Sequence, residues 1–261
     1  TTALADVTSG GVWTSSNTAT ATVNASTGVV TGVAAGSTTI TYTVTSINGC
    51  STSVTTTVTV NAIPVVAAIS GTTEVCAGST TGLTSATAGG TWSSSNTAVA
   101  TVNASTGVVT GVAAGSVTIT YTVTINGCTS NAQATVTVNA LPVLASIGGT
   151  TNACVGSTTT LTNTTSGGVW TSSATAVATV NTITGTVTGV SAGTSTITYT
   201  YTNSNGCVSS VTTTVTINAL PTVAAITGTT SVCEGATTAL ADVTSGGVWT
   251  SSNTATATVN A

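Results

Sequence analysis

The side chains that could do chemistry are few, and they recur at the interval of an internal repeat. The 261 residues contain no Lys, Arg or His, and the only carboxylates are Asp6, Glu74, Glu234 and Asp242. Asp6 matches Asp242 and Glu74 matches Glu234 in the repeat, so the carboxylates form no designed acid–base pair. General acid–base catalysis needs a titratable group placed in a cleft, and a nucleophilic Ser needs a neighbouring base. We therefore predict that the protein is not an enzyme and has no catalytic, cofactor-binding or metal-binding residues.

The missing basic side chains also limit the partners. Nucleic-acid affinity comes mostly from Lys and Arg contacts to phosphate, and a polybasic membrane-surface signal needs the same residues. No run of eighteen apolar residues occurs, which argues against direct membrane insertion. The partners that we expect are neighbouring repeats of the same chain, laterally associated identical chains, and an external surface or glycan of unknown identity.

Six Cys residues are the remaining reactive groups, and they occur at two places in each repeat. Without His or a Cys-x-x-Cys pair, a metal site is not indicated. Paired cysteines at a fixed spacing instead indicate disulfides formed in an oxidising compartment. The six residues are Cys50, Cys76, Cys128, Cys154, Cys207 and Cys233.

The repeat itself is about 79 residues long. The four Trp residues are spaced 79, 78 and 79 positions apart, and residues 1–25 are identical to residues 237–261. We interpret the chain as a three-repeat cassette that starts again at residue 237, cut from a parent chain many cassettes long. The predicted domains are 1–62 (a repeat lacking its first strand), 63–140 and 141–219 (complete repeats), and 220–261 (the N-terminal half of a further repeat).

Each repeat has the pattern of an all-β domain. Thr, Val and Ile alternate in residues 115–125, and Asn126-Gly127 is a strong hairpin signal. Seven short strands separated by turns are typical of an immunoglobulin-like β-sandwich, and tandem copies would form a linear rod or fibre. For the repeat 63–140 we predict strands near 65–69, 79–84, 91–95, 98–102, 108–112, 116–125 and 129–138.

One Trp per repeat follows a Gly-Gly turn at the third strand, where such sandwiches bury a Trp. A sugar-stacking Trp is the functional alternative, but sugar sites usually gather several aromatic side chains. The predicted core residues are Trp13, Trp92, Trp170, Trp249, Tyr42, Tyr121 and Tyr199.

Two disulfide patterns fit the spacing. Pairing within a repeat gives Cys76–Cys128 and Cys154–Cys207, whereas pairing across the Pro junctions gives Cys50–Cys76, Cys128–Cys154 and Cys207–Cys233. Cys128 opens a last strand of about ten residues, roughly 33 Å long, whereas a disulfide needs Cα atoms within roughly 7 Å. Cys154, which follows that strand, should therefore be far from Cys128. Cys76 is on the first strand of the same sandwich, and we expect that strand to start at the same end as Cys128. We therefore favour pairing within the repeat, which leaves Cys50 and Cys233 with partners outside residues 1–261 and would shield the residues between Cys76 and Cys128 from tension.

The segment GGTWSSSNTAVATVNASTGVVTGVAAGSVTITYTV, together with VCAGST and NGC, resembles the bacterial immunoglobulin-like group 2 repeats of giant Bacteroidetes surface adhesins, of the SprB-like gliding type. The resemblance covers essentially the whole chain. It implies an extracellular protein at the bacterial cell surface. The function that we expect is the stalk or filament of a repetitive adhesin, which transmits tension and projects adhesive parts for attachment or gliding. The alternative is a ligand-binding array, for carbohydrate or ice, on the same scaffold.

Overall fold

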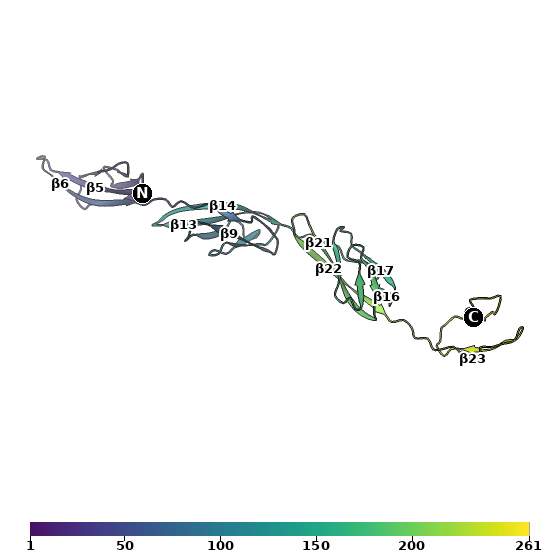
Figure 1. Cartoon of the computed structure of the whole chain (residues 1–261). Helices are drawn as coiled ribbons and strands as arrows, with labels where there is room; N and C mark the ends of the chain where they lie inside the picture. Colours follow the sequence, from purple (N-terminus) through teal and green to yellow (C-terminus); the bar gives the residue numbers. More distant parts are fainter. Residues whose placement is uncertain (261) are drawn as a thin grey trace. The chain divides into compact units, whose positions relative to one another are not determined.

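A computed structural model describes residues 1–260 (Figure 1). All regular elements of this range are β-strands, and it holds no helix that could cross a membrane. The chain divides into two compact units, one formed by Thr1–Pro142 with Thr202–Val208 and the other by Val143–Tyr201 with Ser209–Ala261. Each unit is described by itself.

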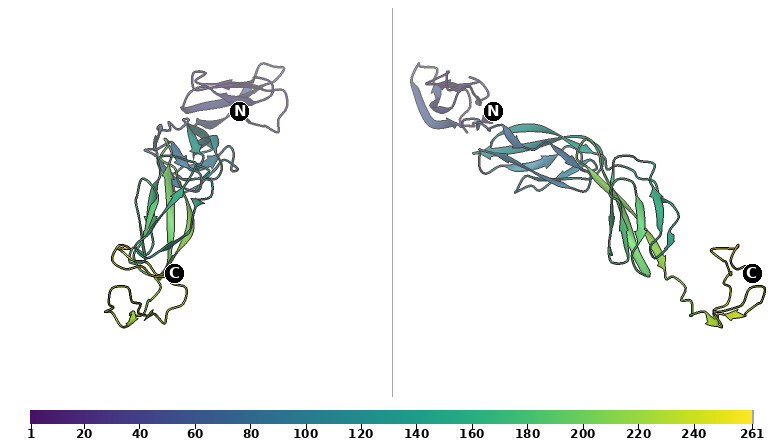
Figure 2. Two further views of the ribbon diagram at one scale, coloured as in Figure 1. Left: turned by 90° about the vertical axis from the view of Figure 1, so that its right-hand side faces the viewer. Right: turned by 45° about the vertical axis from the view of Figure 1, so that its right-hand side comes forward.

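The second repeat, in the first unit, shows the architecture completely. Two four-stranded sheets, ordered β10-β13-β14-β8 and β11-β12-β9-β7, face each other as a β-sandwich (Figure 2). The immunoglobulin-like class of the fold is therefore confirmed. The strands are β7 (Ile69–Gly71), β8 (Glu74–Cys76), β9 (Thr80–Ser85), β10 (Thr91–Ser94), β11 (Ala100–Val102), β12 (Val108–Gly111), β13 (Gly115–Ile125) and β14 (Cys128–Asn139).

The first strand of this repeat differs from the prediction. The strand predicted near residues 65–69 begins only at Ile69; the chain forms the short β7, passes to the other sheet, and forms β8. Gly71 permits the crossing because its φ is 123°, and a Cβ there would collide with the carbonyl of Gly82. β8 then pairs in parallel with the end of β14, so that Cys76 lies opposite Asn139. This parallel register decides where the first cysteine of a repeat is placed.

The long hairpin β13–β14 explains why this sequence forms a sandwich. Val117, Ile119, Tyr121 and Val123 are all buried, whereas the Thr residues between them lie on the outer face. A period of two on a β-strand sends alternate side chains to opposite faces, so one face is apolar and the other hydroxylated. Asn126 and Gly127 both have positive φ at the turn, as the hairpin prediction required.

The predicted aromatic residues meet in the core of each of the three sandwiches. Trp92 lies directly across from Tyr121 on the neighbouring strand, with ring centroids 4.6 Å apart. The Tyr121 hydroxyl donates to the carbonyl of Thr87 at 2.7 Å and accepts the N–H of Gly90 at 2.8 Å. A tilted aromatic pair stabilises by about 0.5–1.5 kcal/mol beyond its area burial. The hydroxyl explains the Gly-Gly turn, since a Cβ on Gly90 would overlap the Tyr ring.

The third repeat forms the same two sheets, ordered β16-β22-β21-β18 and β15-β17-β20-β19. Trp170 and Tyr199 are 3% exposed each and stack at 4.6 Å. The strands are β15 (Gly148–Gly149), β16 (Asn152–Cys154), β17 (Thr158–Thr162), β18 (Val169–Ser172), β19 (Ala178–Val180), β20 (Thr186–Gly189), β21 (Gly193–Thr202) and β22 (Val208–Asn218).

The first repeat contains two three-stranded sheets, ordered β2-β5-β6 and β1-β4-β3, around Trp13 and Tyr42. Residues 220–260 form only the two-stranded pair β23–β24, and Trp249 is half-buried there. The predicted domain boundaries remain predictions. The strands are β1 (Thr2–Ala3), β2 (Val12–Ser15), β3 (Ala21–Val23), β4 (Val29–Gly32), β5 (Gly36–Thr45), β6 (Ser51–Val60), β23 (Thr227–Gly228) and β24 (Leu240–Ala241).

Candidate functional site

The carboxylates serve local structure. Asp6 accepts the N–H of Thr8 at 2.8 Å, and Asp242 accepts the N–H of Thr244 at 2.6 Å, so each Asp fixes the turn before a Gly-Gly pair. Glu74 and Glu234 are exposed. Within residues 1–260, no group of three His, Cys, Asp or Glu side chains is close enough to hold a metal ion. The absence of catalysis stays a prediction.

The reactive feature of the structure is a cystine that the sequence did not predict. Cys76 is bonded to Cys207, with Cα atoms 5.6 Å apart and 131 positions between them in the chain. Both predicted pairs, Cys76–Cys128 and Cys154–Cys207, are therefore wrong in this structure. The cystine lies within the first compact unit, because the hairpin tip Thr202–Val208 belongs to that unit.

The parallel register of the first strand explains the error. Cys76 lies opposite Asn139, at the end of β14, whereas Cys128 opens the same strand. Eleven positions separate Cys128 from Asn139, or about 36 Å at ~3.3 Å per residue. The equivalent register places Cys154 opposite Asn218, at the end of β22. A disulfide within either repeat would have to span a whole strand, which its geometry forbids. The idea that such a bond shields residues 77–127 from tension fails with the pairing.

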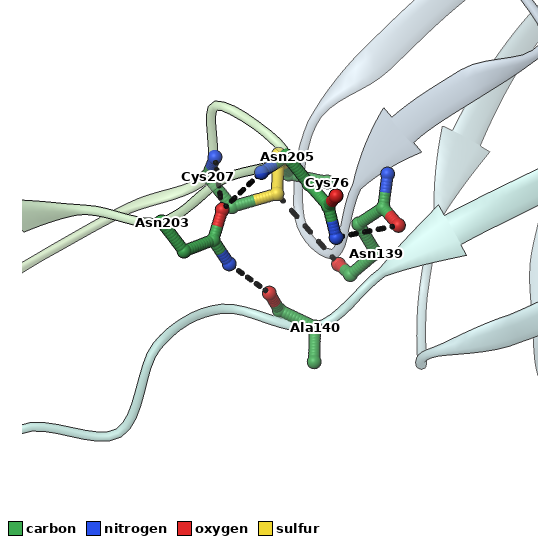
Figure 3. The surroundings of a disulfide bond; sticks show 6 residues. All are labelled: Cys76, Asn139, Ala140, Asn203, Asn205 and Cys207. Atoms are coloured by element: carbon green, nitrogen blue, oxygen red, sulfur yellow. Dashed lines mark hydrogen bonds between the residues drawn. A yellow bond between two sulfur atoms is a disulfide. The ribbon is translucent and has the colours of Figure 1, made fainter.

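Asparagine side chains position the hairpin tip around the cystine (Figure 3). Asn203 donates through Nδ2 to the carbonyl of Ala140 at 3.2 Å, and Asn205 donates through Nδ2 to Oδ1 of Asn139 at 3.1 Å. The N–H of Cys207 donates to Oδ1 of Asn203 at 2.9 Å, which ties the sulfur-bearing residue to the loop. Cys207 is only 1% exposed. The hairpin tip that carries Cys207 is thus held by direct hydrogen bonds to Asn139, the last residue of β14, and to Ala140 after it.

A shallow depression of about 350 Å³ adjoins the cystine. Its lining includes the exposed Glu74, hydroxyl groups of Ser and Thr, and the side chains of Asn139 and Asn205. Its lining residues are Thr72, Glu74, Val75, Cys76, Ser79, Thr80, Thr81, Asn139 and Asn205, none of them aromatic. The depression therefore lacks the aromatic platform on which a sugar ring would stack.

Within residues 1–260 the other four cysteines are free, and the surroundings of one of them, Cys128, resemble those of Cys207. Cys50, Cys154 and Cys233 are exposed. Cys128 is half-buried, with its Sγ 3.6 Å from the carbonyl oxygen of Asn61. Asn61 occupies the place in the first repeat that Asn139 occupies in the second, and the Sγ of Cys207 lies 4.0 Å from the carbonyl oxygen of Asn139. Cys128 and Cys207 therefore contact equivalent strand ends.

Sequence reasoning missed the residues that hold the hairpin tips. Asn61, Asn139 and Asn218 each begin an Asn-Ala-(Ile or Leu)-Pro segment, which was interpreted only as a linker. In the structure, Asn61 donates through Nδ2 to the carbonyl of Asn126, and Asn139 receives the side chain of Asn205. The invariant Asn before each Ala-x-Pro in this chain was the available signal.

The sheets, the split first strand and the buried Trp–Tyr pair define a protein built from tandem immunoglobulin-like domains. The sequence profile of the bacterial Ig-like domain (group 2) family matches residues 1–55 and 54–138. The chain belongs to this family. No curated protein matches the sequence significantly.

Solved structures show a distant likeness. A SusE-like surface located polysaccharide binding protein from Bacteroides thetaiotaomicron is 13% identical with a TM-score of 0.38; the match covers 70% of this chain and 43% of that one. Mouse cadherin-23 repeats EC22–24 are 12% identical with a TM-score of 0.27, covering 82% and 89%. Drosophila N-cadherin EC1–3 is 10% identical with a TM-score of 0.24, covering 84% and 92%. Likenesses at these scores do not identify a function.

Proposed function

We propose that the chain is a section of the extracellular stalk of a long bacterial surface adhesin, which projects adhesive parts and carries tension between them and the cell. The observation that carries the proposal is the cystine between Cys76 and Cys207, which covalently joins a first strand to the hairpin tip of the following repeat. A bond placed between consecutive repeats resists their separation.

Composition and redox chemistry support the same proposal. Disulfides persist in oxidising surroundings outside the cytoplasm, which favours a secreted, cell-surface location. Charged residues make up 2% of the chain, and the outer faces of the strands carry hydroxyl groups instead. Gliding is the finer version of the proposal, since the sequence resembles the SprB-like adhesins.

A length-replacement experiment in the bacterium tests the stalk role. Whole three-repeat cassettes are deleted in frame, and in a matched strain the deleted cassettes are replaced by the same number of unrelated immunoglobulin-like repeats. We expect attachment under flow to fall as the stalk shortens and to recover in the matched strain, because a stalk acts through its length and strength. Loss of attachment in the matched strain would contradict the proposal.

The carbohydrate- or ice-binding alternative gives the opposite result in a binding assay. The purified chain is applied to a glycan array and tested for thermal hysteresis, with an unrelated immunoglobulin-like protein as control. We expect neither specific glycan retention nor hysteresis above that control. Saturable binding to one glycan class, lost when the depression beside Glu74 is altered, would favour a ligand-binding surface.

A further inference from the structure

We propose that the Cys76–Cys207 bond is one case of a general rule: the first cysteine of each repeat pairs with the second cysteine of the next repeat. The rule follows from the strand register. The first cysteine lies opposite the end of the last strand in both complete repeats, at Cys76 with Asn139 and at Cys154 with Asn218. The second cysteine opens that strand or directly precedes it. Partners within one repeat are therefore a strand length apart, whereas partners in consecutive repeats meet at the junction.

Cys128 is already in the position that the rule requires. Its sulfur contacts the carbonyl of Asn61 at 3.6 Å, as that of Cys207 contacts the carbonyl of Asn139. In the second repeat, Cys76 lies opposite Asn139, the counterpart of Asn61. A cysteine opposite Asn61 would therefore lie beside Cys128, and the first repeat should supply it from its own first strand.

The cassette identity tells which cysteine that is. Residues 237–261 repeat residues 1–25 without a change, and Cys233 stands four positions before Thr237. In a continuing array the counterpart of Cys233 stands four positions before Thr1 and pairs with Cys128. By the same shift, Cys154 pairs with the counterpart of Cys50 in the next cassette. All six cysteines of the cassette are then used, in the three pair types Cys76–Cys207, Cys154–Cys50 and Cys233–Cys128.

The chemistry of each bond is an ordinary oxidation. Two thiols lose two protons and two electrons, and an oxidised thiol–disulfide oxidoreductase of the secretory route accepts them, its own disulfide becoming a dithiol. The reaction proceeds through a mixed disulfide, which the free thiolate of the second cysteine resolves. Each bond can form only after the following repeat has folded and presented its hairpin tip.

The rule makes the array a continuous covalent ladder. Two paths lead from Cys76 to Cys233. The bridged path crosses the disulfide to Cys207 and then follows 26 residues of chain to Cys233, where the next disulfide begins. The unbridged path follows the chain alone and is 157 residues long. At ~3.5 Å per residue, a stretched bridged segment measures about 90 Å and an unbridged one about 550 Å. Each complete repeat contains parts of two such bridged paths, one on its first strand and one on its last strand. These strands form the parallel pairs β8–β14 in the second repeat and β16–β22 in the third. Domain unfolding then adds little length.

A peptide map of the native array tests the rule. Because the chain has no Lys or Arg, trypsin cannot cut it. Chymotrypsin combined with a Glu-specific protease separates the cysteines except Cys207 and Cys233, because the only Leu between these two precedes a Pro. Thermolysin, which cuts before Val and Ile, then separates Cys207 from Cys233. The protein is alkylated, denatured without reductant, and digested. We expect crosslinked peptides carrying Cys76 with Cys207, Cys154 with Cys50, and Cys233 with Cys128. Crosslinks of Cys76 with Cys128 or of Cys154 with Cys207, or unpaired alkylated cysteines, would overturn the rule. The stalk role could still hold in that case.

Pulling single native arrays gives an independent measurement. We expect reductant to increase the fully stretched length per pair of repeats roughly sixfold, because the unbridged path has 157 residues and the bridged path has 26. A reduced and alkylated array serves as the control and should already show the long extension. Equal extension with and without reductant would refute the ladder, whatever the adhesive function.

Discussion

Two hairpin tips of the first compact unit contact equivalent strand ends in different ways. The tip of β21–β22 has five residues between its strands and uses its own Asn203 and Asn205 to bind Ala140 and Asn139. The tip of β13–β14 has two residues between its strands and offers only a carbonyl, which accepts a hydrogen bond from Asn61 at 3.0 Å.

The side-chain donor thus lies on the hairpin tip in one case and on the strand end in the other, whereas the sulfur atom occupies an equivalent position in both. The Sγ of Cys128 lies 3.6 Å from the backbone carbonyl oxygen of Asn61, and the Sγ of Cys207 lies 4.0 Å from the equivalent oxygen of Asn139. The comparison teaches that the hydrogen bonds are interchangeable adaptations to loop length, and that the sulfur position is the shared feature. The difference between the tips is that, among the residues that the structure describes, Cys207 is bonded to Cys76 whereas Cys128 is free.

The largest expected effect comes from giving Cys128 that partner. Residues 221–236 are added before Thr1, which reproduces the segment that precedes the identical residues 237–261 and supplies one new cysteine. We expect a second cystine to form in air, so that Cys128 becomes resistant to alkylation while Cys50, Cys154 and Cys233 still react.

The control is the same extension with Ser in place of the new cysteine, in which all four free cysteines should be labelled. Mass spectrometry of the alkylated chains gives the number of labelled cysteines. Labelling of Cys128 in both extended chains would show that the two tips are not equivalent.

The second prediction concerns removal of the disulfide, which leaves the tip of β21–β22 without a covalent bond, as the tip of β13–β14 is. In Cys76→Ser, the tip Thr202–Val208 keeps its Asn203 and Asn205 hydrogen bonds but loses the covalent bond. Two side-chain hydrogen bonds of about 1 kcal/mol each hold a tip weakly, so we expect amide exchange at residues 202–208 to rise roughly tenfold to hundredfold. Hydrogen–deuterium exchange measures this, with the core strand β13 as an internal reference that should not change.

Removing single asparagine side chains should have smaller effects, each confined to the hairpin tip whose hydrogen bond is lost. Asn205→Ala deletes a donor on the tip, and Asn61→Ala deletes the donor on the strand end. Each should weaken its own tip by about 0.5–1.5 kcal/mol, the usual net value of one hydrogen bond. Exchange at both tips is measured in each variant. If Asn61→Ala left residues 125–128 unchanged, the contact would be incidental.

The smallest expected effect concerns the short turn. Asn126 has φ of 51°, a left-handed conformation that Asn tolerates better than Ala. We expect Asn126→Ala to lower the free energy of unfolding of its repeat by about 1 kcal/mol and Asn126→Gly to change it by less than about 0.5 kcal/mol. Chemical denaturation of both variants decides; a larger cost for Gly than for Ala would exclude backbone conformation as the reason for Asn.

The sequence determined the repeat length, the all-β class and most strand positions. These properties are local: alternating β-branched residues select a half-buried strand, as at Val117 and Ile119, and Asn126-Gly127 selects a tight turn. The buried position of Tyr121 followed from the same alternation, whereas that of Trp92 followed from its place on the third strand after a Gly-Gly turn.

Only the tertiary structure decided the disulfide partner. The spacing of the cysteines fits pairing within a repeat and pairing across the Pro junctions, and it does not show which end of the last strand the first strand reaches. The chain crosses between sheets at Gly71 and runs parallel to β14, which takes Cys76 to Asn139 and about 36 Å from Cys128 at ~3.3 Å per residue. That crossing depends on contacts between segments some sixty residues apart, and no local pattern encodes it.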